Sequence, residues 1–352
     1  MKKKILCAVL GVLMLFALVA CGTGSGDGET TTVPSTSAPA GEITTDGQDN
    51  PTPTERTAVN LAVLAGPTGM GASYLMEQNE AGESKNAYTV TVATAPDQVT
   101  AGLINGSLDM AAIPTNLAAV LYQKTEGGVQ VLACNTLGVL YLLENGDTVH
   151  SVEDLRGKTV YATGQGSTPE YIFSYILAKN GLTVGTDVTV EYLAEHAELA
   201  AKLKAGEVVL GVLPEPQVSV AMMGNADLRV ALNLTEEWNR VAGDSALIQG
   251  CIAVRTAFAQ EHPEAISAFL TEYEASVNYV NENPEAAAKL IEKHGIVAKE
   301  AIALRAIPNA NMVCMTGAEM KTKLSGFLQV LFDADAKSVG GKLPDDGFYY
   351  GN

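Results

Sequence analysis

Short β-rich runs alternate with helical patterns from residue 58 to residue 254, and this alternation constrains the fold more than any other feature of the sequence. Runs of four to eight β-branched and apolar residues bounded by Gly, Pro or Asn indicate strands, whereas longer stretches with helical spacing indicate helices. Strands are predicted at 59–64, 89–92, 110–113, 129–134, 139–143, 159–162, 188–193, 208–213, 228–232 and 247–254. Helices are predicted at 70–80, 97–104, 117–124, 169–180, 197–205 and 215–223. Such alternation is typical of α/β domains.

The pattern changes after residue 254, where no further strand is predicted. Amphipathic helices are expected at 263–281, 284–294, 299–306 and 318–332. Pro263 and Pro284 fit the first turn of a helix, where the missing N–H costs no hydrogen bond.

Several predicted strands run into a turn of Gly, Pro, Ser or Thr that opens a helix. These turns present free backbone N–H groups and hydroxyls at the positive end of a helix. Ligands of open α/β sheets bind at the carboxyl ends of strands, so the turns are expected to converge on one site. A further strand junction at 135–138 offers amide and hydroxyl groups. The predicted ligand-binding residues are Thr68, Gly69, Met70, Thr115, Asn116, Asn135, Thr136, Gln165, Gly166, Ser167, Thr168 and Glu215.

Each of these turns also fits an ordinary structural role. Ser167 with Glu170 three residues later has the pattern of a capping box. Asn135 fits a turn in which the side chain hydrogen-bonds its own backbone. Glu215 lies between two prolines after an apolar strand, so it fits either a partner for a ligand amine or a cap for the next helix. The sequence leaves these alternatives open.

Motifs of catalysis and nucleotide binding are missing from the sequence. It contains no P-loop, no G-x-G-x-x-G after a strand, no G-x-S-x-G, no H-E-x-x-H and no C-x-x-C. The four histidines are scattered and are interpreted as solvated surface residues: His150, His196, His262 and His294. We therefore predict no enzymatic activity, no cofactor and no metal, and no effect of chelators on stability or ligand binding.

The cysteines give no disulfide framework, because three widely spaced ones remain once Cys7 and Cys21 are set aside. Cys134 and Cys251 lie in apolar strand-like runs and are interpreted as buried, inert thiols. A single disulfide among Cys134, Cys251 and Cys314 remains an alternative.

The first residues have the layout of a secretion signal. Three lysines precede an apolar run at 5–20, which at ~1.5 Å per residue spans about 24 Å, less than the ~30 Å hydrocarbon core of a bilayer. Residues 1–20 are therefore predicted to be a signal peptide. The run ends in Ala20-Cys21-Gly22, which resembles the bacterial lipobox and predicts lipidation of Cys21. An ordinary cleaved signal and an uncleaved anchor are the alternatives.

Residues 21–57 are predicted to be a disordered tether, since they are nearly all Gly, Ser, Thr, Pro and acidic or amide residues. A flexible coil of this length reaches about 30–36 Å. The whole chain has a net charge of −18, and the acidic body argues against nucleic acid as a partner.

Four segments of the body carry a family resemblance by their order and spacing. They are Ala101-Gly102-Leu103 through Gly106, Asp109 and Ala111; Asp154-Leu155-Arg156-Gly157-Lys158; Ala205-Gly206-Glu207-Val208 with Pro214-Glu215-Pro216; and Ile252-Ala253-Val254-Arg255 through His262-Pro263-Glu264. With them the body from Ala58 onward resembles the solute-binding proteins of ABC importers, in the branch associated with sulfonates, taurine, nitrate and thiamine-pyrimidine precursors. Val209 departs from the pattern, since relatives often carry Asp there.

The resemblance implies an α/β, two-lobed periplasmic-binding-protein-like fold of type II, with two hinge crossings and a ligand cleft between the lobes. Lobe 1 is expected at 58–145 plus 249–352, and lobe 2 at 146–248. Binding would then favour a closed form over an open one.

The resemblance also implies a function. The chain is expected to be a monomeric lipoprotein on the extracytoplasmic face of the cell membrane, anchored through Cys21. It would capture a small polar organic solute, similar to a sulfonate, nitrate or a thiamine precursor, and deliver it to an ABC permease with its ATPase. The alternatives are a ligand sensor for a membrane receptor and a pyrimidine-precursor enzyme on the same fold. The signal and the scattered histidines argue against the enzyme.

Overall fold

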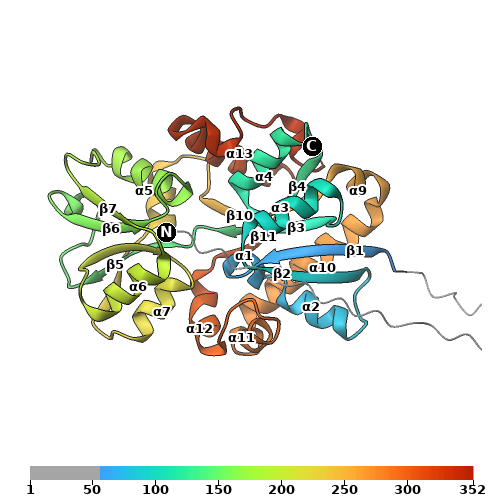
Figure 1. Cartoon of the computed structure of the whole chain (residues 1–352), viewed down its shortest axis with the longest axis horizontal. Helices are drawn as coiled ribbons and strands as arrows, with labels where there is room; N and C mark the ends of the chain where they lie inside the picture. Colours follow the sequence, from blue (N-terminus) through green and yellow to red (C-terminus); the bar gives the residue numbers. More distant parts are fainter. Residues whose placement is uncertain (1–55, 352) are drawn as a thin grey trace, which may run out of the picture. The chain divides into compact units, whose positions relative to one another are not determined.

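The strands form two mixed sheets in the computed structural model, which describes residues 56–351 (Figure 1). The first sheet has the order β11-β4-β10-β3-β1-β2 and the second β7-β6-β8-β5-β9. The strand bounds are β1 Ala58–Leu64, β2 Ala87–Ala93, β3 Met110–Pro114, β4 Val129–Leu137, β5 Leu140–Asn145, β6 Thr159–Thr163, β7 Thr189–Leu193, β8 Leu210–Pro214, β9 Leu228–Asn233, β10 Ile248–Arg255 and β11 Met312–Met315. The predicted α/β class is confirmed.

The first sheet is buried on both faces. Alternate side chains of β1 enter different cores: Leu61 and Val63 face one, and Ala62 and Leu64 face the other. This follows from the two-residue period of a strand. It also explains why β1 is an almost unbroken apolar run, as expected for a strand covered on both sides.

Helices connect and cover the strands. Their bounds are α1 Pro67–Met70, α2 Ser73–Glu80, α3 Pro96–Asn105, α4 Thr115–Lys124, α5 Thr168–Lys179, α6 His196–Ala205, α7 Gln217–Met223, α8 Leu234–Val241, α9 Thr256–Glu261, α10 Pro263–Glu282, α11 Pro284–Lys293, α12 Glu300–Ala306 and α13 Gly317–Ala334. Short 3-10 turns include η2 at Ile307–Asn309. Pro263 and Pro284 lie in the first turns of α10 and α11, as predicted.

Two sequence expectations were wrong. A strand does follow residue 254, because β11 pairs antiparallel with β4. It was missed because it has four residues and no alternation of polar and apolar side chains. The helix predicted at 70–80 is divided into α1 and α2.

The chain passes from the first sheet to the second between β4 and β5 and returns through α8 to β10. The expected lobe 1 included β5, but β5 pairs with β8 and β9 in the second sheet. We therefore propose the predicted two-lobe division with its first crossing moved to the residues between β4 and β5. A hydrogen bond of 2.7 Å from the Val139 N–H to the Gln249 Oε1 joins this crossing to the start of β10.

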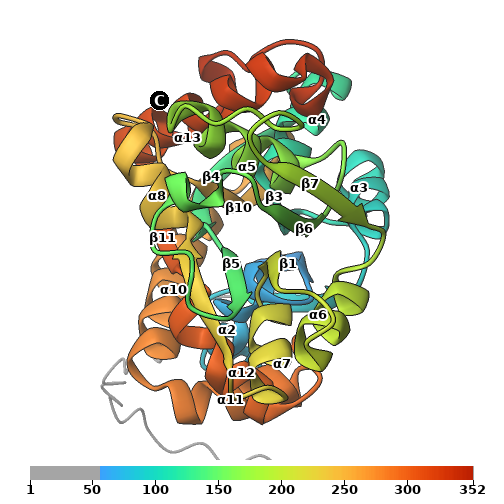
Figure 2. The same cartoon turned by 90° about the vertical axis from the view of Figure 1, so that its left-hand side faces the viewer.

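An aromatic contact connects helices that follow or cover different sheets. Trp238 of α8 is fully buried, and its ring centroid lies 4.8 Å from that of Tyr175 in α5 and 5.5 Å from that of Phe327 in α13. Helix α5 follows a strand of the second sheet, whereas α13 packs on β4 and β10 of the first. Figure 2 shows α13 and α5 side by side. Trp238 therefore acts as a packing anchor between these helices.

Cys134 and Cys251 are fully buried on neighbouring strands, and Cys314 is partly buried. All three are free thiols, and burial raises the pKa of each. The predicted burial of Cys134 and Cys251 is confirmed, and the structure has no disulfide among the three.

The predictions for the signal peptide, Cys21 and the tether fall outside the described residues, apart from the last two residues of the tether. Over residues 56–351, no helix combines the length and the apolar character that crossing a membrane requires.

Candidate ligand-binding site

A cavity of about 520 Å³ is lined by strand-to-helix junctions of both sheets. From the first sheet come the junctions of β1 with α1, β2 with α3, and β3 with α4; from the second come those of β6 with α5, β7 with α6, and the end of β8. The carboxyl ends of six strands therefore surround one space, as expected for ligand sites of α/β sheets.

Four helices of ten or more residues begin at this cavity. Pro96 opens α3, Asn116 lies in the first turn of α4, Thr168 opens α5 and His196 opens α6. No side chain in the described part of the chain caps the N-terminus of any of these four helices. The first N–H groups of each helix, which lack partners within the helix, are thus left for solvent or a ligand.

The lining is polar but carries no fixed charge. Its hydroxyls and amides come from Thr68, Thr94, Asn116, Thr136, Ser167, Thr168 and Gln249, and the remaining lining is largely apolar, including several prolines. Among the described lining residues, none has a carboxylate, ammonium or guanidinium group. The electrostatic character of the cavity is therefore set by helix dipoles, whose positive ends favour anions.

Five of the predicted ligand-binding residues line this cavity together. They are Thr68, Asn116, Thr136, Ser167 and Thr168. They come from both sheets and are separated by up to 100 positions in the sequence. The fold therefore brings together residues for which the sequence showed only similar positions at the ends of strands.

Asn135 and Thr115 lie behind the cavity lining and hold it in place. The buried Asn135 amide donates to the Thr68 carbonyl at 2.9 Å and accepts from the Thr136 hydroxyl at 3.1 Å. The Thr115 hydroxyl donates to the Ile248 carbonyl at 2.7 Å, which fixes the start of α4 against β10. Both side chains position lining residues and do not themselves face the cavity.

Gly69 and Met70 also lie outside the lining, in the tight turn after β1. A Cβ on Gly69 would lie 2.3 Å from the Leu64 carbonyl oxygen, so only glycine fits there. Met70 is fully buried in the core. Gly69 lets the backbone of the turn approach the Leu64 carbonyl closely, and Met70 packs in the core.

Gln165 and Gly166 are exposed and do not line the cavity. The capping box expected for Ser167 and Glu170 does not form: the Ser167 hydroxyl donates to the Gly164 carbonyl at 2.6 Å, and Glu170 accepts from the Gly166 N–H at 2.5 Å. The Ser167 side chain therefore braces the turn at the cavity wall.

Glu215 is buried next to the cavity but is not part of its lining. Its carboxylate accepts hydrogen bonds from the Ser219 N–H and hydroxyl and from the Asn309 amide. Burial raises the pKa of Glu215 in spite of these donors. Of the two roles left open, the contact with the start of α7 is the one that the geometry supports.

The sequence interpretation missed several lining residues. Thr94, Pro96 and His196 occupy strand-to-helix junctions as well, and a rule based on position alone would have found them. They were overlooked because those junctions lack a Gly- or Ser-rich turn. Gln249 lies inside β10, where no local signal marks it.

Two of the histidines differ from the surface role expected for them. His196 is exposed, but it lines the cavity, and its Nδ1 lies 2.5 Å from the Thr163 hydroxyl. The side chain of His294 is only 4% exposed, so its interpretation as a solvated residue was wrong.

Comparison with protein families gives a match over most of the body. A family described as "ABC transporter, phosphonate, periplasmic substrate-binding protein" matches residues 72–302. The comparison with curated proteins returned no match.

Solved structures with the same architecture are numerous. An ABC transporter structure from Parabacteroides distasonis is 26% identical with a TM-score of 0.71, covering 83% of this chain and 98% of the other. The periplasmic aliphatic sulphonate binding protein of Escherichia coli is 16% identical with a TM-score of 0.63, covering 82% and 92%. The alkanesulfonate-binding protein of Xanthomonas axonopodis, bound to MOPS, is 17% identical with a TM-score of 0.57, covering 83% and 96%. These likenesses establish the two-lobed fold.

Proposed function

Because the chain belongs to the family of ABC-transporter phosphonate periplasmic substrate-binding proteins, we propose that it captures a small organic anion with a phosphonate- or sulfonate-type head group. The bound anion is then delivered to the permease of an ABC importer. The predicted residues Thr68, Asn116, Thr136, Ser167 and Thr168 provide side-chain contacts in this proposal, together with His196 and Gln249.

The observation that carries the proposal is the convergence of four uncapped helix N-termini on one cavity. Free N–H groups and the positive ends of helix dipoles bind phosphate-like and sulfonate-like oxygens without a charged side chain. The hydroxyls of Thr68, Thr94 and Thr168 supply further donors, whereas the hydroxyl hydrogens of Thr136 and Ser167 are engaged by Asn135 and Gly164. A ligand amine would find no carboxylate among the described lining residues, since Glu215 is engaged by Ser219 and Asn309.

The size of the cavity also supports a small solute. Pockets for small molecules commonly enclose about 300–1,000 Å³, and this one encloses about 520 Å³. The prolines and aliphatic side chains of the lining would contact the organic part of the solute.

The solute class can be tested by calorimetric titration of the full chain, after unfolding and refolding to remove any retained ligand. Alkylphosphonates and alkanesulfonates are expected to bind with 1:1 stoichiometry. Nitrate and an aminopyrimidine serve as the competing classes that the sequence left open. Binding of the aminopyrimidine alone, or of none of these compounds, would refute the proposal.

A matched pair of variants tests the sign of the ligand charge. Asn116→Asp places a carboxylate at the cavity with little change in shape. Two like charges about 4 Å apart repel by roughly 4 kcal/mol at an effective dielectric constant of 20, which is several hundred-fold in affinity. Asn239→Asp, on the exposed surface of α8, adds the same charge away from the cavity and should leave affinity nearly unchanged. Tighter binding in the Asn116→Asp variant would indicate a cationic ligand instead.

We further propose that Cys21 is lipidated and anchors the protein at the extracytoplasmic face of the cell membrane. The apolar run at 5–20 and the lipobox-like Ala20-Cys21-Gly22 support this. In membrane fractionation, Cys21→Ser should move the protein from the membrane to the soluble fraction, while Cys7→Ser should not. Equal membrane retention of the Cys21→Ser variant would contradict the anchor.

A further inference from the structure

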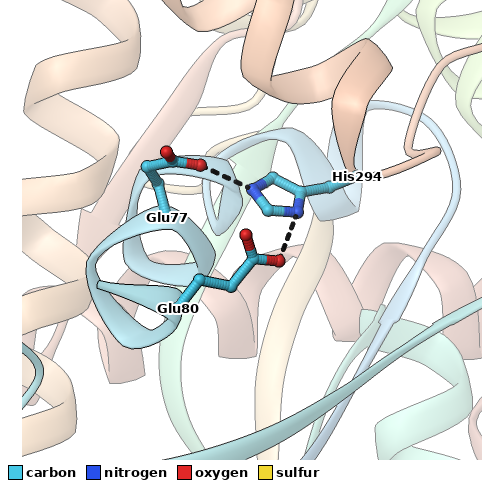
Figure 3. A group of neighbouring side chains, drawn as sticks. All are labelled: Glu77, Glu80 and His294. Atoms are coloured by element: carbon cyan, nitrogen blue, oxygen red, sulfur yellow. Dashed lines mark ion pairs between the residues drawn. The ribbon is translucent and has the colours of Figure 1, made fainter. Parts of the chain in front are cut away.

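Away from the ligand cavity, two carboxylates of α2 face a histidine at the end of α11. Figure 3 shows Glu77 and Glu80 directed at the imidazole ring of His294 from the same side of α2. The His294 Nε2 lies 3.5 Å from a Glu77 carboxylate oxygen, and its Nδ1 lies 3.6 Å from a Glu80 oxygen. One ligating atom from each of the three residues lies within 4.8 Å of the others.

The Nε2 atom of the His294 imidazole has no hydrogen-bond partner among the described residues. Its side chain is 4% exposed, and its Nε2 atom is buried with no hydrogen bond to any of the described residues. A buried polar atom left without a partner is costly, and in folded proteins such an atom often belongs to a site that binds an ion or a water molecule. Here the Nε2 atom lies near a Glu77 carboxylate oxygen, a group that also attracts a cation.

The spacing of the groups suits a metal ion shared between them. Ligands about 2.1 Å from a tetrahedral zinc ion lie roughly 3.4 Å from one another, close to the 3.5 Å between the His294 Nε2 and the Glu77 oxygen. Glu77 and Glu80 are three residues apart on a helix and so share one face of it. Their side chains are 36% and 55% exposed, which leaves the outer side open to water and to an entering ion.

In place of the metal-free chain expected from the sequence, we propose that Glu77, Glu80 and His294 form a binding site for a divalent transition-metal ion of the zinc class, with water as the remaining ligand. This site is separate from the solute cavity and does not depend on the proposed function. An imidazole nitrogen with two carboxylate oxygens favours Zn²⁺ over Mg²⁺ and Ca²⁺, which prefer oxygen ligands alone.

Lys293 competes with a metal for the same carboxylates. Its ammonium lies 2.8 Å from a Glu80 oxygen and also forms an ion pair with Glu77. The Lys293 side chain is 47% exposed, so it can turn into solvent when an ion enters. Metal binding at this site therefore exchanges one cation for another.

The site also has a structural consequence. It joins α2, near the start of the body, to the end of α11 more than 200 residues later, and these helices pack against each other. A bound ion would crosslink the two helices. Because a ligand that binds only the folded state stabilises that state, metal binding should raise the stability of the protein.

Titration of chelator-treated full-length protein with ZnCl₂ under reducing conditions tests the proposal. The wild type should bind one equivalent at this site and gain thermal stability. His294→Ala should weaken that binding by more than about 100-fold, since loss of an outer partner alone typically costs 10- to 100-fold. His150→Ala is the matched control, because it removes a histidine from an exposed His–Asp pair. MgCl₂ should produce neither effect.

Lys293→Gln distinguishes a metal site from a simple ion pair. Removal of the competing ammonium should tighten zinc binding by about fivefold or more. The double variant Glu77→Gln, Glu80→Gln changes only partly exposed side chains and serves if His294→Ala fails to fold. Equal zinc affinity of the wild type with either His294→Ala or the double variant would overturn the proposal, as would weaker binding by Lys293→Gln or no binding by the wild type.

Discussion

Glu215 shows how a single buried carboxylate can make stability depend on pH. It follows β8 and is 3% exposed. Its carboxylate accepts a hydrogen bond from the side-chain amide of Asn309, which lies in η2 in the C-terminal part of the chain. Burial disfavours its charged form and raises its pKa, although the Ser219 and Asn309 donors act in the opposite direction. The folded protein therefore binds a proton at Glu215 more tightly than the unfolded chain does.

The stabilising contribution of Glu215 should accordingly be present below about pH 4.3, the ordinary pKa of glutamate, and be lost as the pH rises through the raised value in the folded state. We predict that the free energy of unfolding of the wild type decreases relative to that of Glu215→Gln as the pH is raised from acid to neutral. Urea unfolding at a series of pH values measures this. Glu282→Gln, at the exposed end of α10, gives the baseline for loss of one carboxyl. A difference that stays constant, or that grows with pH, would contradict the assignment.

At the residue scale the sequence predicted positions better than roles. Thr68, Asn116 and Ser167 were found because each follows a strand, and the strand ends meet at the cavity. Asn135 and Glu215 occupy comparable positions in the sequence, but their side chains turn to protein partners. Which way a polar side chain turns depends on donors far away in the chain, such as Asn309 for Glu215, and local sequence does not contain that information.

At the scale of elements, the turn between β1 and α1 depends on one glycine. The space beside Gly69 is closed by the Leu64 carbonyl, a backbone group that cannot move aside without distorting β1. Gly69→Ala is expected to destabilise the protein by about 1–3 kcal/mol, as overpacking typically does. Denaturant unfolding gives the value.

Gly224→Ala is the control for this substitution, because the added methyl group would meet only the flexible Lys204 side chain. If the Gly69→Ala variant were as stable as the Gly224→Ala variant, the close approach in the turn would not be a constraint.

Strands and helices with a clear period were predictable, whereas elements defined by their partners were not. The buried strands β1, β3 and β10 and the long amphipathic helices α10 and α13 occur where the pattern indicated. The strand β11 exists because β4 offers it an unpaired edge, and it begins after Asn311, whose φ is +46°. Pairing of this kind comes from tertiary structure.

At the scale of the whole molecule, the folded body is expected to be independent of the tether predicted at residues 21–57, whose composition cannot form a core. Within residues 56–351, the cavity lining begins at Leu64 and the core begins at Val59. Removal of residues 1–55 is therefore expected to leave the midpoint of thermal unfolding unchanged. The solute affinity should stay within about twofold of that of the full chain, a change below about 0.5 kcal/mol. Calorimetry of both forms checks this.

A slightly longer deletion provides the contrast. Removal of residues 1–65 also deletes β1, which pairs with both β2 and β3 in the first sheet. This variant should not fold. Loss of solute binding in the shorter deletion would mean that the first 55 residues take part in the site.

The aromatic contact between the lobes has a practical consequence. Trp238 is the single tryptophan of the chain, and it lies where α5 of one lobe meets α13 of the other. Its indole N–H donates to the Ser245 hydroxyl in the segment that leads into the second crossing. Indole emission responds to nearby rings and hydrogen bonds, so this chain carries an intrinsic fluorophore at the contact of α5, α8 and α13. Solute titrations could then be followed by fluorescence without any label.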